Sequence, residues 1–164
     1  MDNTTGKKIL VIDDEVYIRD SVVCFLEDFG YEVSEAENGR IGLEKIENQR
    51  PDLILCDLRM PEMDGLEVLA HVTQNHKNIP IIIVSGVGNI SDTVEALRLG
   101  AWDYIIKPIQ DMNVLSHALE KAFERKAFIE EKKGYQRELE QANKELNLSL
   151  ESLELTRDQL VQSA

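Results

Sequence analysis

The chain has 164 residues, of which 43% are hydrophobic and 30% charged, and a formal net charge of −13 at pH 7. This length and composition predict a soluble globular domain with an additional segment, and they exclude a largely disordered chain. The negative charge argues against direct nucleic-acid binding, because displacing counterions from phosphates needs cationic side chains. It argues equally against docking on anionic lipid.

The sequence also predicts a cytoplasmic location. Residues 1–8 are polar and lack the apolar core of a secretory signal, and no stretch approaches the ~18 apolar residues of a membrane span. Cys24 and Cys56 lie in apolar stretches, and the sequence has no C-x-x-C pair or Cys/His cluster. Both cysteines are therefore expected to be small buried hydrophobic residues rather than a disulfide or a metal site.

Short apolar runs rich in β-branched residues predict five β-strands. Three of the runs have a stretch of at least four consecutive apolar residues, which is typical of strands buried on both faces of a parallel sheet. In chain order the predicted strands are Lys8–Ile12, Tyr31–Ala36, Asp52–Cys56, Ile79–Val84 and Asp103–Ile106.

Stretches of helical periodicity separate these strands, and polar residues at their starts can act as N-caps. The first helix is expected over Val16–Phe29, with Gly30 as its stop and an apolar face of Ile18, Val22, Phe25, Leu26 and Phe29. The later helices are expected to start at Asn38, at Asp64, at Ser91 or Asp92, and at Asp111 or Asn113. Strict alternation predicts a doubly wound α/β domain, in which right-handed crossovers place the loops after the strands at one edge.

The segment after about residue 111 has no strand signal and predicts helix almost to the end of the chain. Gly134 interrupts this pattern and is a candidate joint. Beyond it, leucines recur every seven residues, which is the pattern of a coiled coil, although the companion positions are mostly polar. These leucines are Leu139, Leu146, Leu153 and Leu160. The alternative interpretation is a solvated surface helix packed on its own domain.

Side chains that could bind ligands or react follow four of the predicted strands. Asp13 and Asp14 follow the first strand and Asp57 the third, while Ser85 and Lys107 follow the fourth and fifth. Open parallel sheets bind ligands at this edge. Three carboxylates suit a hard cation such as Mg²⁺, and a lysine with a hydroxyl suits phosphoryl oxygens. A carboxylate can also act as the nucleophile and form an acyl phosphate.

Four motifs, in this order and spacing, resemble the receiver domain of two-component response regulators. They are Ile9–Glu15, Asp57–Gly65, Ser85-Gly86 and Lys107-Pro108. The resemblance covers roughly residues 7–125. It implies a flavodoxin-like fold, with a five-stranded parallel sheet of order 2-1-3-4-5 and a C-terminal helical or coiled-coil extension.

The resemblance implies that Asp57 is the phosphoacceptor. It would receive a phosphoryl group from the phosphohistidine of a sensor histidine kinase or of a histidine phosphotransfer protein. Mg²⁺ would be held by Asp13, Asp14, Asp57 and the backbone carbonyl of Arg59. Lys107 would pair with the phosphoryl oxygens.

The same resemblance implies a conformational switch. Ser85 would move to hydrogen-bond the phosphoryl group, and Tyr104 would turn inward into the vacated space. The peptide bond Lys107-Pro108 would be cis. A further hypothesis concerns the lifetime of the phosphorylated form. Arg59 and Val87 lie two residues beyond Asp57 and Ser85, and they would shield the phosphoryl group from water.

The predicted organisation is a receiver domain over residues 1–125 and a helical linker, expected to be a coiled coil, over 126–164. The linker would make the protein a homodimer, and it resembles helices that precede a histidine kinase. The chain stops within this helix, so a fragment of a larger protein is expected, whose missing output module would be a histidine kinase, a phosphatase or a cyclic-dinucleotide enzyme. The chain itself would carry only self-phosphotransfer and autodephosphorylation.

Two other classes remain open from the sequence. One is an enzyme with an aspartyl nucleophile similar to haloacid-dehalogenase phosphatases, but that pattern needs a second Asp where this chain has Arg59. The other is a non-phosphorylated, receiver-like interaction scaffold or dimerisation module, and the complete set of Asp, Ser and Lys residues argues against it.

Overall fold

The computed structural model describes residues 6–86 and 90–163. The chain divides into two compact units, 1–124 and 125–164, which are called here the α/β unit and the C-terminal unit. The division falls one residue before the boundary expected from the sequence.

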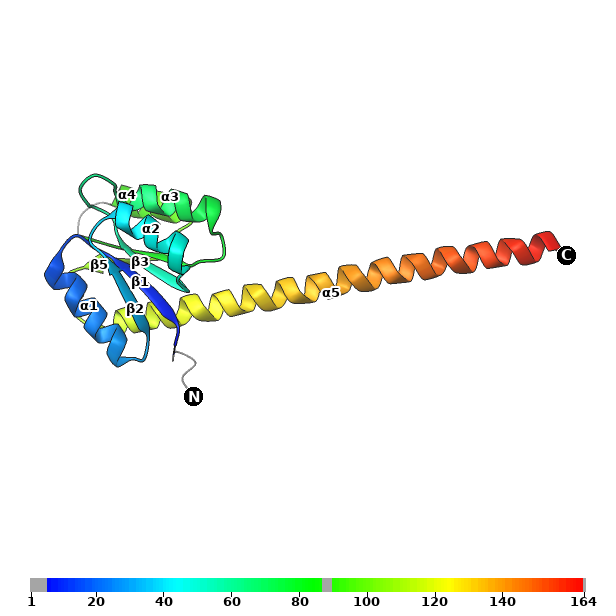
Figure 1. Cartoon of the computed structure of the whole chain (residues 1–164), viewed down its shortest axis with the longest axis horizontal. Helices are drawn as coiled ribbons and strands as arrows, with labels where there is room; N and C mark the ends of the chain where they lie inside the picture. Colours follow the sequence, from blue (N-terminus) through cyan, green and yellow to red (C-terminus); the bar gives the residue numbers. More distant parts are fainter. Residues whose placement is uncertain (1–5, 87–89, 164) are drawn as a thin grey trace. The chain divides into compact units, whose positions relative to one another are not determined.

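A five-stranded parallel sheet forms the centre of the α/β unit (Figure 1). Its strand order is β2-β1-β3-β4-β5, so the predicted flavodoxin-like topology is confirmed. The strands are β1 (Lys8–Ile12), β2 (Glu32–Ala36), β3 (Leu53–Asp57), β4 (Ile81–Gly86) and β5 (Asp103–Lys107). The last three end one or two residues later than predicted, because Asp57, Ser85 and Lys107 are themselves part of the ladder, and β3 and β4 also begin later. Asp57 is paired with Val84, and Lys107 with Gly86.

Among the described residues, five helices accompany the sheet: α1 (Val16–Asp28), α2 (Gly39–Gln49), α3 (Gly65–Asn75), α4 (Ile90–Arg98) and α5 (Asn113–Ser163). Two predicted N-caps are confirmed. The Asn38 side chain accepts a hydrogen bond from the Ile41 amide and the Asp64 side chain from the Glu67 amide, each at 2.9 Å. The start of α4 is one residue earlier than predicted, so Ser91 and Asp92 lie within its first turn.

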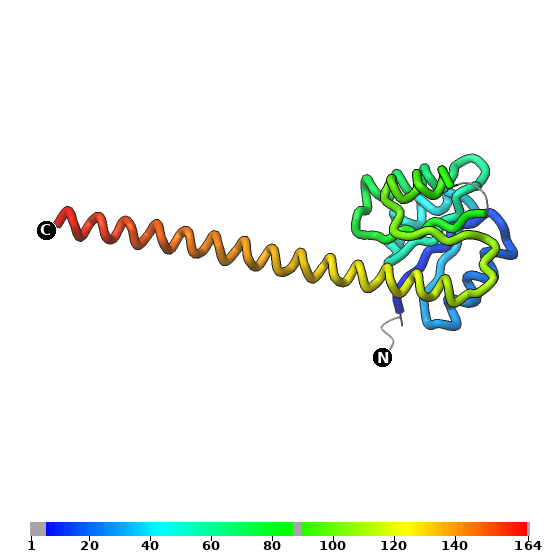
Figure 2. Tube along the Cα trace, turned by 180° about the vertical axis from the view of Figure 1, so that it is seen from behind, coloured from blue at the N-terminus to red at the C-terminus, as the bar shows by residue number. Residues whose placement is uncertain are grey.

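Helices cover both faces of the sheet (Figures 1 and 2), and an apolar cluster lies beneath them on each face. On one face, α1 and the first turns of α5 bury Val22, Leu26, Leu115 and Leu119. On the other face, α2, α3 and α4 bury Ile46, Val68, Leu69, Val72 and Ala96. The central strands β1, β3 and β4 contribute to both clusters, which explains their continuous apolar runs.

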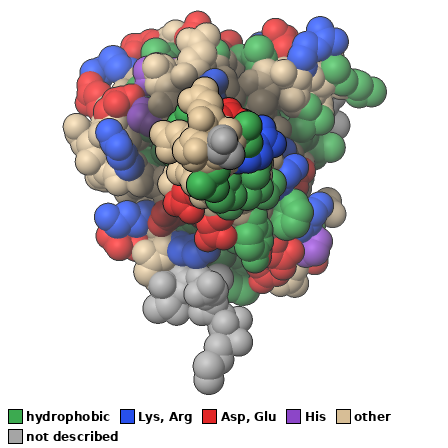
Figure 3. Space-filling view, turned by 90° about the vertical axis from the view of Figure 1, so that its right-hand side faces the viewer, with side chains coloured by type: hydrophobic (Ala, Val, Ile, Leu, Met, Phe, Trp, Pro, Cys, Tyr) green, Lys and Arg blue, Asp and Glu red, His purple; other side chains and the backbone are tan. Residues whose placement is uncertain are grey.

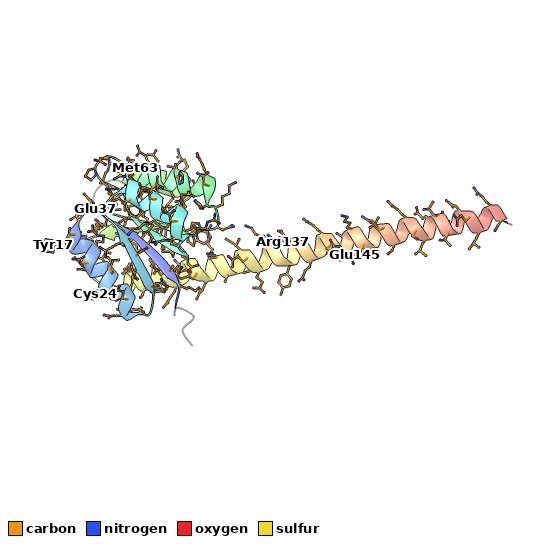
Figure 4. All side chains as sticks on the ribbon, viewed as in Figure 1. Tyr17, Cys24, Glu37, Met63, Arg137 and Glu145 are labelled. Atoms are coloured by element: carbon orange, nitrogen blue, oxygen red, sulfur yellow. The ribbon has the colours of Figure 1, made fainter. Side chains whose placement is uncertain are left out.

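The expectation that both cysteines are buried was wrong for Cys24. Cys56 is buried in β3, but Cys24 is exposed on α1 (Figure 4). The buried face of α1 passes through Val22 and Leu26, and a residue two positions from each lies on the opposite side of a helix. Phe29 also departs from its prediction, since 43% of its surface remains exposed beyond the last turn of α1.

The described part of the C-terminal unit is the portion of helix α5 from Arg125 onward. Gly134 lies inside this helix without interrupting it, so the expected joint is not observed. The side chains of this unit stand out from the helix all round (Figure 4). Leu139, Leu146, Leu153 and Leu160 each remain 57–66% exposed in the single chain. Within the part of the chain that the structure describes, no helix is long and apolar enough to cross a membrane.

Candidate functional site

The carboxyl ends of β1, β3 and β5 bring three charged side chains into one buried pocket. Asp13 follows β1, Asp57 ends β3 and Lys107 ends β5. Their exposed fractions are only 5%, 5% and 8%. Buried charges are unfavourable unless they are paired, so this concentration requires specific partners.

The ammonium group of Lys107 supplies these partners. Its Nζ lies 2.7 Å from Oδ2 of Asp13 and 3.3 Å from Oδ2 of Asp57. Oε1 of Glu15 is 3.6 Å away. One cation therefore faces three carboxylates, and the pocket keeps a net negative charge.

The protonation equilibria reflect this imbalance. Burial raises the pKa of Asp57 to about 6; the attraction of Lys107 opposes the shift, and the neighbouring carboxylates Asp13 and Asp14 reinforce it. Burial also disfavours charge on Lys107. The hydrogen bond to Asp13 and the charges of Asp57 and Asp13 outweigh burial and hold the pKa of Lys107 above its ordinary value. Lys107 is thus ionised at neutral pH.

The acidic residues of the pocket fit a hard divalent cation. Carboxylate oxygens of Asp13, Asp14, Glu15 and Asp57 all lie within 4.8 Å of one another. An all-oxygen set with uncompensated negative charge is the ligand chemistry of Mg²⁺. Glu15 was not among the predicted ligands, although it directly follows Asp14 in the sequence.

Arg19 is a supporting residue that the sequence analysis missed. Its side chain is buried in α1, and its Nη1 donates a hydrogen bond of 2.6 Å to the backbone carbonyl of Asp13. Its Nε pairs with Oε1 of Glu35 at 3.2 Å. The signal was present in the sequence, because Arg19 shares the helical face of Val22 and Leu26. A charged residue on an apolar face usually has a buried partner.

Gly65 fixes the other side of the pocket. Its amide donates a hydrogen bond of 2.7 Å to the carbonyl of Leu58 at the start of α3. A Cβ at this position would lie 2.3 Å from the backbone oxygen of Asp57 and 2.8 Å from Cα of Leu58. Only glycine lets α3 approach the end of β3 and the loop after it this closely.

The predicted switch residues occupy neighbouring strands. Ser85 is 5% exposed near the end of β4, one residue beyond the partner of Asp57 in the ladder. Tyr104, in β5, is half-buried against the apolar cluster beneath α2, α3 and α4. The peptide bond between Lys107 and Pro108 is cis.

Arg59 and Val87 are the residues expected to shield the pocket, and the structure describes only the first. The guanidinium of Arg59 forms an ion pair with the carboxylate of Asp92 in α4. It therefore links the loop after β3 to the first turn of α4. Val87 lies outside the described residues.

Replacing Asp57 with Asn should stabilise the metal-free protein at neutral pH. A carboxyl group whose pKa rises from 3.8 to about 6 on folding stabilises the fold below pH 3.8, and this contribution is lost as the pH rises through 6. With EDTA present at pH 7.5, the free energy of unfolding of Asp57→Asn should exceed that of the parent chain by about 1–2 kcal/mol, after allowance for solvent screening. The variant should therefore unfold at a higher urea concentration. The gain should vanish near pH 4. An equal gain at both pH values, or the same gain in the exposed-site control Asp20→Asn, would contradict this assignment.

Replacing Gly65 with Ala should destabilise the α/β unit. The added methyl group meets backbone atoms, which cannot move aside cheaply, so a loss of about 1–3 kcal/mol is expected in urea unfolding. Gly134→Ala is the matched control. There a Cβ meets no atom within 4 Å, and Ala should be neutral or favourable in the helix. Equal stability of Gly65→Ala and the parent chain would show that the close approach of α3 is unimportant.

Comparison with known proteins agrees with this architecture. Residues 9–120 match the family model described as the response regulator receiver domain. The chain is 40% identical over 116 residues to the chemotaxis protein CheY of Listeria monocytogenes, which covers 70% of this chain and 97% of that protein. It is 41% identical over 114 residues to the transcriptional regulatory protein ZraR of Escherichia coli. That match again covers 70% of this chain but only 26% of ZraR.

Solved structures give the same result. NtrX from Brucella abortus superposes with a TM-score of 0.74 at 36% identity, over 77% of this chain and 29% of NtrX. A CheY-like receiver domain protein from Methanospirillum hungatei superposes with a TM-score of 0.69, also at 36% identity, over 75% of this chain and 98% of that one. The chain therefore belongs to the receiver domain family of two-component response regulators.

Proposed function

We propose that the α/β unit is a phosphoacceptor switch and that Asp57 accepts the phosphoryl group. The donor is the phosphohistidine of a sensor histidine kinase or of a histidine phosphotransfer protein. The observation that carries the proposal is the position of the Asp57 carboxylate, which lies between a buried ammonium group and an acidic cluster at the ligand-binding edge of a parallel sheet.

Asp57 suits the role of nucleophile better than Asp13. Both oxygens of Asp13 are engaged, Oδ2 by Lys107 at 2.7 Å and Oδ1 by the Glu15 amide at 2.9 Å. The contact between Asp57 and Lys107 is longer, at 3.3 Å, and leaves this carboxylate less constrained. Its pKa of about 6 keeps most of it ionised at neutral pH, as nucleophilic attack requires.

In the transfer, a carboxylate oxygen of Asp57 forms a bond to phosphorus while the bond from phosphorus to the imidazole nitrogen breaks. The electron pair of the broken bond stays on the histidine. The ammonium group of Lys107 pairs with the phosphoryl oxygens, and the hydroxyl of Ser85 donates a hydrogen bond to one of them. When bound, Mg²⁺ supplies neutralising charge for the same oxygens. Asp13, Asp14, Asp57 and the backbone carbonyl of Arg59 would hold it.

Phosphorylation changes the surface formed by α4, β5 and the first turns of α5. Movement of Ser85 toward the phosphoryl group lets Tyr104 turn inward. This surface already presents apolar side chains: Ile90, Val94, Leu97 and Ile106 are 48–84% exposed. A change there alters which partner can dock.

The C-terminal unit acts as the transmitting helix of a homodimer. Its exposed leucines, Leu139 to Leu160 at intervals of seven, form the seam. Phosphorylation changes the pairing or rotation of the two helices, and they connect to an output module such as a histidine kinase or a phosphatase. The chain spans about a quarter of ZraR, so output activities of longer relatives are no guide to this one.

Acetyl phosphate with Mg²⁺ should increase the intact mass of the chain by one phosphoryl group. The fluorescence of Trp102, the single tryptophan, should change in parallel. Asp57→Asn and chelation by EDTA should each abolish both responses. Asp52→Asn, directly before the opposite end of β3, is the matched control and should behave as the parent. Phosphorylation that persists in Asp57→Asn would disprove the assignment. A parent chain that accepts no phosphoryl group would favour the interaction scaffold.

Cysteine crosslinking should report the pairing of the C-terminal helices. Cys24 is exposed and must first be replaced by Ser, whereas Cys56 is buried and can remain. In that background Leu146→Cys should form disulfide-linked dimers, and Lys144→Cys, on the opposite side of the helix, should not. The yield should change on phosphorylation. Equal yields at the two positions, or yields that phosphorylation leaves unchanged, would contradict the transmission model.

A further inference from the structure

A second group of ligating side chains lies away from the Asp57 pocket. It consists of Glu47 near the end of α2, His71 in α3 and His76 at the C-cap of α3, and is called here the His–Glu cluster. Oε1 of Glu47 is 3.1 Å from Nε2 of His71 and 2.7 Å from Nε2 of His76. All three ligand atoms lie within 4.8 Å of one another.

The topology separates this cluster from the phosphoacceptor. In a parallel α/β sheet the helices run opposite to the strands, so the ends of α2 and α3 lie at the edge away from Asp57. The cluster is partly buried: the side chains of His76, His71 and Glu47 are 13%, 35% and 51% exposed. Figure 3 shows histidine side chains at the molecular surface beside acidic ones.

We propose that the His–Glu cluster is a binding site for a late first-row divalent cation, specifically Zn²⁺. The ligands are Oε1 of Glu47, Nε2 of His71 and Nε2 of His76, and water occupies the remaining position. Two imidazoles and one carboxylate form a common three-ligand set for zinc with an open position. The imidazole ligands also give this site a different metal preference from the Asp57 pocket, whose oxygen ligands suit Mg²⁺.

The distances fit tetrahedral coordination. Ligand atoms about 2.0 Å from zinc at tetrahedral angles are roughly 3.3 Å apart. The two measured separations from Glu47 are 3.1 and 2.7 Å, so small side-chain rotations would open enough room.

The proton positions of the cluster must change when a cation binds. Without metal, Nε2 of His71 and Nε2 of His76 lie at hydrogen-bond distance from the Glu47 carboxylate, as protonated ring nitrogens would. Metal binding requires that each Nε2 present its lone pair, with the ring proton on Nδ1. The amide nitrogen of Asn75 lies 3.4 Å from Nδ1 of His71. The same nitrogen donates a hydrogen bond of 3.0 Å to the backbone carbonyl of His71, which holds the Asn75 side chain beside this ring.

Bound metal would join α2 to α3 on one face of the sheet. It would also lie near the single tryptophan, because His76 and Trp102 line the same small cavity, of about 140 Å³. Trp102 is therefore a built-in reporter for a metal that quenches fluorescence, such as Cu²⁺.

The test uses the whole chain without a histidine tag, stripped of transition metals and kept in excess Mg²⁺ so that the oxygen-rich pocket is occupied. Calorimetric titration with Zn²⁺ should show one ion bound per chain. Co²⁺ should give the intense visible absorption of tetrahedral coordination, and Cu²⁺ should quench Trp102. His76→Gln and Glu47→Gln should each weaken Zn²⁺ binding by at least about 10-fold.

His117→Gln is the matched control, since it removes the chain's remaining histidine, which is exposed on α5, and should leave the affinity unchanged. Thermal unfolding of each variant without zinc separates loss of a ligand from loss of fold. If His76→Gln is unstable, the more exposed Glu47→Gln decides the question. Zinc affinity that is equal in parent, Glu47→Gln and His71→Gln would overturn the proposal, and so would zinc binding that excess Mg²⁺ abolishes.

Discussion

The buried ammonium of Lys107, held between Asp13 and Asp57, is the interaction on which the rest of the pocket depends. Three strands that are far apart in sequence must end at the same level for this contact to form. Without Lys107, two buried carboxylates would face each other with no cation, which is unfavourable in a medium of low polarity. Its presence still leaves the pocket negative, and that residual charge makes the site receptive to a divalent cation and to a phosphoryl group.

The surrounding packing holds these charges in place. Arg19 anchors the backbone carbonyl of Asp13 from α1, and Gly65 brings the start of α3 against the backbone of Asp57 and Leu58. The sheet itself is held by apolar clusters on both faces, in which closely packed side chains fix the positions of the strands. The positions of the carboxylates therefore follow from the hydrophobic core as much as from local electrostatics.

The α/β unit separates two kinds of metal-binding chemistry. Oxygen ligands gather where the strands end, and imidazoles gather where α2 and α3 end. This separation follows from the alternation of strand and helix, since each helix returns the chain to the opposite edge of the sheet. A cation that favours nitrogen and one that favours oxygen would thus bind without competing for side chains.

The sequence by itself determined the strands, the two confirmed helix caps and the sheet edge that carries Asp57, because apolar runs, capping residues and strand ends are local patterns. It gave the wrong environment for Cys24, since only the packing of α1 decides which side of that helix is buried. The apolar face of α1 indicates that Arg19 has a buried partner, but not that the partner is Asp13, and the meeting of Glu47 with His71 and His76 could not be predicted. These side chains lie 6 to 29 residues apart, and only the tertiary structure brings them together.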